Sequence, residues 1–111
     1  MSAIVYLMTE WRFLSNHAQV VLCVAGDPGI RLRDIAASVD ITERAAHRIV
    51  DELVRDGYIS RERQGRRNHY EVQKHLPLRD PLLSERKLAD LLELLSGPDG
   101  KPKARRSKTP R

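Results

Sequence analysis

Long apolar runs, cysteine pairs and aromatic residues are all scarce in this sequence. No apolar run approaches the roughly 18 residues that a membrane span requires, so we expect no contact with a membrane. Cys23 is the only cysteine, which excludes an intramolecular disulfide and favours a reducing, cytoplasmic location. Aromatic residues make up only 5% of the chain, so the core must be built mainly from Leu, Ile, Val and Ala.

The motifs of enzymes and of metal or cofactor sites are also missing. No motif for a nucleophile, a phosphate-binding loop or a cofactor occurs, so we predict a protein that is not an enzyme and uses no cofactor. The histidines raise metal sensing as an alternative: His17, His47, His69 and His75. They lack paired cysteines and a close His/Asp motif, whereas a metal site needs three or four convergent ligands. We therefore predict no metal site.

The net positive charge comes from the end of the chain. The whole chain carries 20 Lys or Arg against 15 Asp or Glu, which gives +5. Residues 96–111 hold six of these bases and one acid, Asp99, so residues 1–95 keep 14 of each sign and sum to zero. With nothing to bury, residues 96–111 are predicted to be a disordered basic tail. Net charge therefore says nothing about whether the body binds nucleic acid, and the placement of its charges must decide.

The first part of the chain predicts an arm and a buried helix. Residues 1–14 fit a strand, a helix or an extended arm, and Trp11 should pack against its own domain or a partner. A nearly apolar helix follows, because Val20, Val21, Val24 and Ala25 recur at helical spacing. Either Ser15 or Asn16 can cap it, the latter in a capping box with Gln19, and the Gly-Asp-Pro-Gly stretch at 26–29 stops it.

Two short helices and a basic hairpin come next. Residues 30–32 form a short extended segment that could add a third strand to the hairpin. A second helix is predicted over 33–39, and a third runs from a Thr42 cap to Asp56, with Gly57 ending it. Two strands, 58–63 and 69–72, should be joined by a turn at 64–68.

The last predicted helix, residues 82–95, has a leucine stripe at positions i, i+3, i+4 and i+7. The stripe could fold back onto its own domain or pair across a two-fold axis. Because the preceding elements already make a compact core, its surplus apolar surface favours a homodimer. The residues predicted at the dimer interface are Trp11, Leu83, Leu88, Leu91, Leu92 and Leu95.

This order of elements resembles the winged helix-turn-helix of small bacterial transcriptional regulators of the MarR/ArsR-like superfamily. The residues that carry the resemblance are Arg31 to Ala37, Ile41 to Leu53, Gly57 to Ile59 and Gly65 to Tyr70. The resemblance covers roughly residues 11–76. It implies a mainly α (α+β) fold over residues 1–95, with a two- or three-stranded wing sheet and a C-terminal dimerisation helix. Within it lie an arm (1–14), the helix-turn-helix (33–56), the wing (58–72) and the last helix (82–95).

The implied function is sequence-specific binding of double-stranded DNA by a homodimeric regulator. A major groove about 12 Å wide admits one helix, whose arginines can donate to base edges. The predicted DNA-binding residues are Arg33, Thr42, Glu43, Arg44, His47, Arg48, Arg63, Gln64, Arg66, Arg67 and Asn68, with Arg44 and Arg48 as the main readers. Two alternatives stay open: a solvated helix face on which Glu43 or Asp51 pairs the arginines, and a winged helix that binds a protein. The sequence does not identify an effector.

Overall fold

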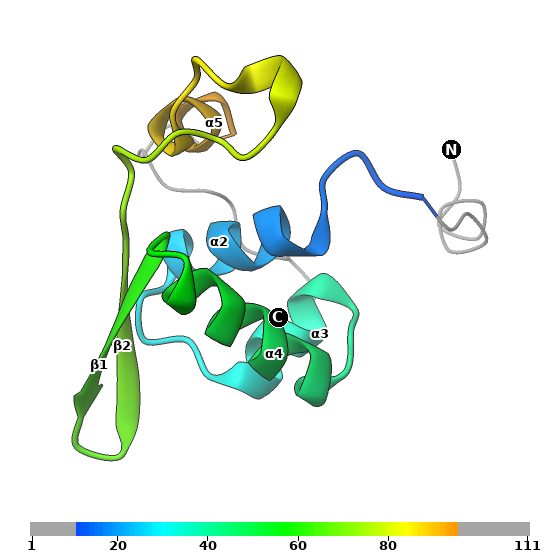
Figure 1. Ribbon diagram of the computed structural model, residues 1–111. Coiled ribbons are helices and arrows are strands. Elements are labelled where there is room, and N and C mark those ends of the chain that lie inside the picture. Colours follow the sequence, from blue (N-terminus) through cyan, green and yellow to red (C-terminus); the bar gives the residue numbers. More distant parts are fainter. Residues whose placement is uncertain (1–10, 96–111) are drawn as a thin grey trace.

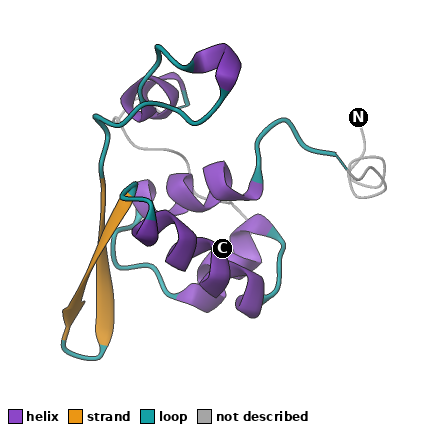
Figure 2. Cartoon of the chain, viewed as in Figure 1, coloured by secondary structure: helices purple, strands orange, loops and turns teal. Residues whose placement is uncertain are grey.

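The computed structural model describes residues 11–95, which form a helical body with a projecting two-stranded hairpin (Figures 1 and 2). The elements in order are α2 (Asn16–Gly26), α3 (Leu32–Val39), α4 (Glu43–Arg55), β1 (Ile59–Gln64), β2 (Arg67–Val72), the 3-10 turn η1 (Pro81–Leu83) and α5 (Leu88–Leu94). The predicted basic tail and residues 1–10 of the predicted arm lie outside the described residues. Within the part described, no helix is both long and apolar enough to cross a membrane.

The arm and the start of α2 are held by side-chain hydrogen bonds. The hydroxyl of Ser15 accepts from the Ala18 amide at 3.1 Å and caps the helix. Gln19 donates instead to the Leu14 carbonyl at 3.1 Å, so the predicted capping box of Asn16 with Gln19 is wrong. Arg12 ties the arm to the end of α3 by donating to the Val39 carbonyl at 2.5 Å.

The helix-turn-helix follows the prediction closely. Asp40 takes a left-handed conformation with φ 68°, which ends α3 and turns the chain toward α4. The Thr42 hydroxyl accepts from the Ala45 amide at 3.0 Å, so Thr42 is the predicted N-cap of α4. A cap of this kind is worth about 1 kcal/mol. It fixes where the exposed first turn of α4 begins.

The sheet has two strands in the described residues, so of the two- or three-stranded sheets expected, the two-stranded one forms, and residues 30–32 add no strand. Arg31 is already the N-cap of α3, and Leu32 enters the helix. The loop between α2 and α3 contacts β2 through one backbone hydrogen bond, from the Tyr70 amide to the Pro28 carbonyl at 2.9 Å.

The hairpin turn is tighter than predicted. The antiparallel register pairs Ile59 with Val72 and Gln64 with Arg67, which leaves only Gly65 and Arg66 in the turn. Gly65 has φ 66°, a conformation that glycine adopts without strain. The chain therefore reverses in two residues, and the predicted loop residues Gln64 and Arg67 belong to the strands.

The core lies between α2, α3, α4 and the base of the hairpin. Its buried residues are Val20, Val21, Val24, Ile30, Ile35, Ala36, Val39, Ala46, Ile49, Val50, Leu53, Ile59, Tyr70, Leu88 and Leu92. Each aliphatic side chain buried in this way contributes about 1.5–3 kcal/mol. Ile59 and Tyr70 are the buried residues of β1 and β2, so the hairpin is anchored at its base and its outer half is exposed.

The predicted helix at 82–95 is wrong in its bounds, because this segment holds the 3-10 turn η1 and the shorter helix α5. The amides of Leu88 and Ala89 donate to the carbonyls of Leu76 and Lys74 at 2.8 and 3.0 Å, so the chain folds back and the start of α5 is bonded to the segment that follows β2. Leu88 and Leu92, predicted as dimer contacts, are 4% and 5% exposed and belong to the core of their own chain. Their apolar surface is thus already covered within their own chain. In the view of Figure 1, α5 sits above α2, opposite α3.

Candidate nucleic-acid interface

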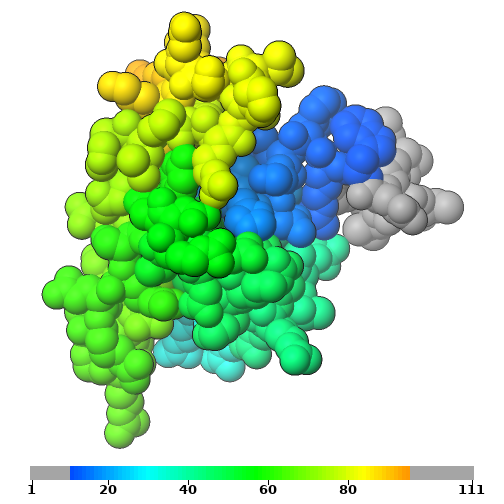
Figure 3. All heavy atoms as spheres, in the orientation of Figure 1, coloured from blue at the N-terminus to red at the C-terminus, as the bar shows by residue number. Residues whose placement is uncertain are grey.

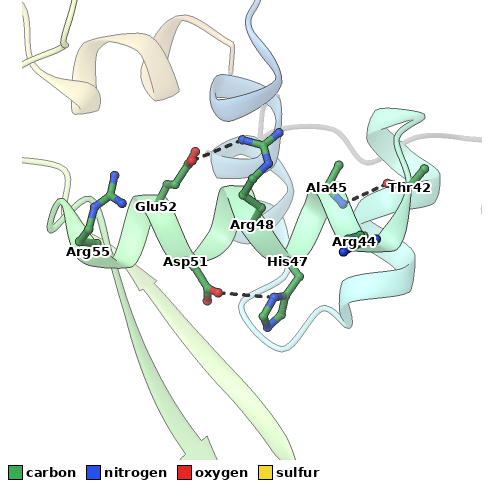
Figure 4. Close-up of a pocket in the computed structure, with 8 residues that line it drawn as sticks. All are labelled: Thr42, Arg44, Ala45, His47, Arg48, Asp51, Glu52 and Arg55. Atoms are coloured by element: carbon green, nitrogen blue, oxygen red, sulfur yellow. Dashed lines mark hydrogen bonds and ion pairs between the residues drawn. The ribbon is translucent and has the colours of Figure 1, made fainter.

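The exposed face of α4 is a shallow, open hollow lined by charged side chains. The opposite side of the helix is buried through Ala46, Ile49, Val50 and Leu53, which leaves one polar face toward solvent. The residues that line the hollow are Thr42, Arg44, Ala45, His47, Arg48, Asp51, Glu52 and Arg55 (Figure 4). Four of the predicted DNA-binding residues are therefore brought together on one face: Thr42, Arg44, His47 and Arg48.

The basic side chains on this face differ in whether an acidic side chain pairs with them. Arg48 donates to a carboxylate oxygen of Glu52 at 3.3 Å, and the Nδ1 atom of His47 lies 3.4 Å from a carboxylate oxygen of Asp51. Both pairs join residues one helical turn apart. Arg44 forms no hydrogen bond or ion pair with any described residue. The predicted pairing of arginines by Asp51 thus occurs at Arg61 of β1, at 3.0 Å, rather than at Arg44 or Arg48.

Glu52 is the member of this face that the sequence analysis missed. One of its oxygens accepts a hydrogen bond from the Arg48 guanidinium, and the other lies 2.7 Å from Nε2 of His17 in α2. The His17 hydrogen bond, assisted by the Arg48 guanidinium and opposed by partial burial, holds the pKa of the Glu52 carboxyl below its ordinary value. The spacing of Arg48 and Glu52 could have indicated their pair, but the contact with His17 spans 35 residues and has no local signal.

The wing carries its arginines in a different setting. Arg66 lies in the two-residue turn and has no bonding partner among residues 11–95. Arg63 donates to the carbonyl of Gly65 at 3.0 Å, within the hairpin itself. Arg67, predicted at the tip, instead donates to the carbonyl of Gly29 at 2.5 Å and so links the hairpin to the loop between α2 and α3.

The wing and α4 form one continuous surface. β1 packs directly against α4, and the Arg61 to Asp51 bond joins their exposed sides. Figure 3 shows the hairpin projecting beyond the body from the flank of α4. Of the remaining predicted residues, Gln64 and Asn68 lie on the two strands near the turn, and Arg33 and Glu43 are exposed on α3 and in the first turn of α4.

The fold and the charged face agree with a sequence comparison. Residues 17–60 match a family described as winged helix-turn-helix DNA-binding. This range runs from α2 through the complete helix-turn-helix into β1. Together with the helices α2 to α4 and the hairpin that follows them, this match shows that the chain has a winged helix-turn-helix fold.

Among solved structures, the chain is similar to the zinc-dependent MarR family transcriptional regulator AdcR in its Zn(II)-bound state. The identity is 16%, the TM-score is 0.43, and the match covers 59% of this chain and 47% of that regulator. The chain thus spans about half of that protein's length. No curated protein matches the chain in sequence. Within residues 11–95, no three His, Cys, Asp or Glu side chains are grouped closely enough to hold a metal ion.

Proposed function

We propose that the protein is a cytoplasmic transcriptional regulator that binds specific sites in double-stranded DNA as a homodimer. The observation that carries the proposal is the arrangement of Arg44 and Arg48 on one exposed face of α4, beside a hairpin with Arg66 at its tip. A single helix fits the major groove, about 12 Å wide, and the first turns of α4 present these arginines to base edges. The Thr42 cap occupies the Ala45 amide, and the amides of Glu43 and Arg44 in the same turn would be the ones to meet a phosphate.

In this proposal the wing supplies sequence-independent affinity. Arg66 and Arg63 are exposed near the turn, and no described acid pairs with either of them. Guanidinium groups without a counter-ion repel one another, and a phosphate relieves that repulsion. The wing would therefore grip the backbone or enter the minor groove beside the site read by α4. Residues 96–111, with six bases, would add non-specific affinity only.

The proposed dimer uses the apolar surface that the chain leaves exposed. Among the predicted interface residues, Trp11 is 65% exposed, Leu83 44% and Leu95 36%, while Leu91 is partly buried. Leu94 adds a side chain that is 78% exposed. In dimeric helix-turn-helix proteins, a two-fold axis sets the two recognition helices on half-sites about 34–36 Å apart. Changing Leu83 and Leu94 together to Ser should lower the dimer mass measured by light scattering, whereas an unchanged mass would remove this surface from the proposal.

The function is tested by a fourfold variant in which Arg44, Arg48, Arg66 and Arg67 become Ala. Affinity for duplex DNA should fall for every sequence, preference among sequences should disappear, and the dependence of binding on salt should flatten. Unchanged affinity together with an unchanged salt slope would reject DNA binding through this surface. Salt-sensitive binding without any preferred sequence in the unaltered protein would instead favour a module that binds an acidic protein.

A further inference from the structure

Glu52 divides its carboxylate between two basic side chains from different helices. One oxygen accepts from the guanidinium of Arg48 at 3.3 Å, and the other lies 2.7 Å from the imidazole of His17. The side chain of Glu52 is 29% exposed and that of Arg48 is 61% exposed. The carboxylate therefore sits at the edge of the body, and the guanidinium it holds stands out on the DNA-facing side.

The contact with His17 separates this pair from an ordinary surface ion pair. His17 belongs to the first turn of α2, which packs against α4, so the carboxylate is held by the body as well as by its own helix. In Figure 4, Glu52 and Arg48 lie together along one side of α4, while Asp51 and His47 lie along the other. Arg44, one turn before Arg48, has no such partner among the described residues. The two proposed readers therefore differ in how far the free protein orders them.

We propose that Glu52 is a positioning residue for Arg48 and that His17 holds it in place. The proposal rests on the proposed function and deepens it. A long arginine side chain loses rotamer freedom when it binds a base, and a side chain already held in one direction loses less. Glu52 would thus raise discrimination between sequences without touching DNA itself.

The same carboxylate has an opposite effect on overall affinity. Its negative charge lies close to the DNA-facing surface and weakens binding to the phosphates of any duplex. Neutralising Glu52 should therefore strengthen binding to unrelated DNA. It should also lower the ratio of the affinity for a preferred site to the affinity for a scrambled site. A general charge effect would change both affinities in parallel and leave that ratio unchanged.

The test is a double-mutant cycle with Glu52→Gln and Arg48→Ala. The quantity measured is the ratio of dissociation constants for a scrambled site and a selected site. For side chains in direct contact, the coupling predicts that Glu52→Gln lowers this ratio about three- to tenfold in the unaltered protein. In the Arg48→Ala background, Glu52→Gln should leave the ratio unchanged. Glu93→Gln, which removes the same charge from the exposed side of α5, is the matched control and should leave the ratio unchanged in both backgrounds.

Two outcomes overturn the proposal: no change in the ratio with Glu52→Gln, or an equal drop with and without Arg48.

A second measurement needs no DNA. The relaxation of the Arg48 side-chain Nε, observed by NMR in the free protein, should show greater mobility in both Glu52→Gln and His17→Ala. Unchanged mobility overturns the positioning role. A protein that selects no sequence would reject the proposed function, and the NMR result would still show separately whether Glu52 orders Arg48.

Discussion

The exposed face of α4 and the tip of the wing both present basic side chains, but their surroundings differ. On α4, Arg48 and His47 are each matched with an acid one turn away, and only Arg44 lacks such a partner among the described residues. At the wing tip, Arg63 bonds to a backbone carbonyl, and Arg66 has no partner among residues 11–95. A carboxylate orients a base and also weakens its pull on phosphate. The paired bases of α4 are therefore held in one direction, whereas the wing tip carries positive charge that no described acid opposes.

The two regions also differ in how firmly the core holds them. α4 buries one full side in the core, whereas the hairpin is fixed at its base by Ile59 and Tyr70. A rigid helix suits base contacts, which require fixed geometry. A projecting hairpin suits phosphate contacts, which carry no sequence information. Under the proposed function, this comparison would give sequence preference to α4 and sequence-independent affinity to the wing.

The largest effect is expected from changing Arg44 and Arg48 to Ala. Each genuine base contact should be worth about 1–3 kcal/mol of discrimination, so the double variant should bind selected and scrambled sites almost equally. Competition binding with the two sites measures this loss. The variant Arg79→Ala with Arg86→Ala removes the same charge outside the interface and serves as the control. Retained discrimination in the α4 variant would break the division between helix and wing.

A smaller and different effect is expected from changing Arg66 and Arg67 to Ala. Binding should weaken by a similar factor for all sequences, and the slope of log K against log salt should flatten by about 0.9 for each phosphate that is no longer neutralised. Titrations at several salt concentrations measure the slope. Arg66→Ala alone isolates the tip, because Arg67 also holds the hairpin to Gly29. Weaker binding confined to the selected site would show that the wing reads bases.

Asp51→Asn should have a modest effect on folding stability. Asp51 joins the two regions through Arg61 of β1 and also lies 3.4 Å from Nδ1 of His47, but all of these groups are partly exposed. Exposed pairs of this kind contribute about 0–1 kcal/mol. Urea denaturation should therefore show a loss of unfolding free energy within that range. A much larger loss would mean that the hairpin depends on Asp51 more than on its buried base.

The smallest effect concerns the dependence of stability on pH. His17 and Arg48 lower the pKa of Glu52, and Arg55 and Arg79 lower that of Asp56. A carboxyl whose pKa is lower in the folded state stabilises the fold above its unfolded pKa, and that contribution is lost as pH falls through the folded pKa. The unfolding free energy should therefore decrease as pH falls below about 4.5, the ordinary value for Glu. In Glu52→Gln this decrease should be shallower, and an identical slope in both proteins would contradict the assigned contacts.

The parts of the fold that the sequence predicts correctly depend on local chemistry. The Thr42 cap, the stop at Gly57 and the buried stripe of α4 are all specified by neighbouring residues, so the helix-turn-helix could be placed from sequence. The C-terminal segment could not be placed, because hydrogen bonds from the start of α5 to Leu76 and Lys74 decide which leucines are buried. The contact of His17 with Glu52 is also non-local, and the sequence analysis therefore found the arginines but missed the group that holds one of them.

The most direct test of the account is selection of bound sequences from a pool of random duplex DNA. The unaltered protein should enrich one inverted repeat, with half-sites about one helical turn apart. The variant lacking Arg44 and Arg48 should still bind DNA but enrich no sequence. If the unaltered protein enriches nothing, or if the variant enriches the same repeat, α4 is not the element that reads DNA.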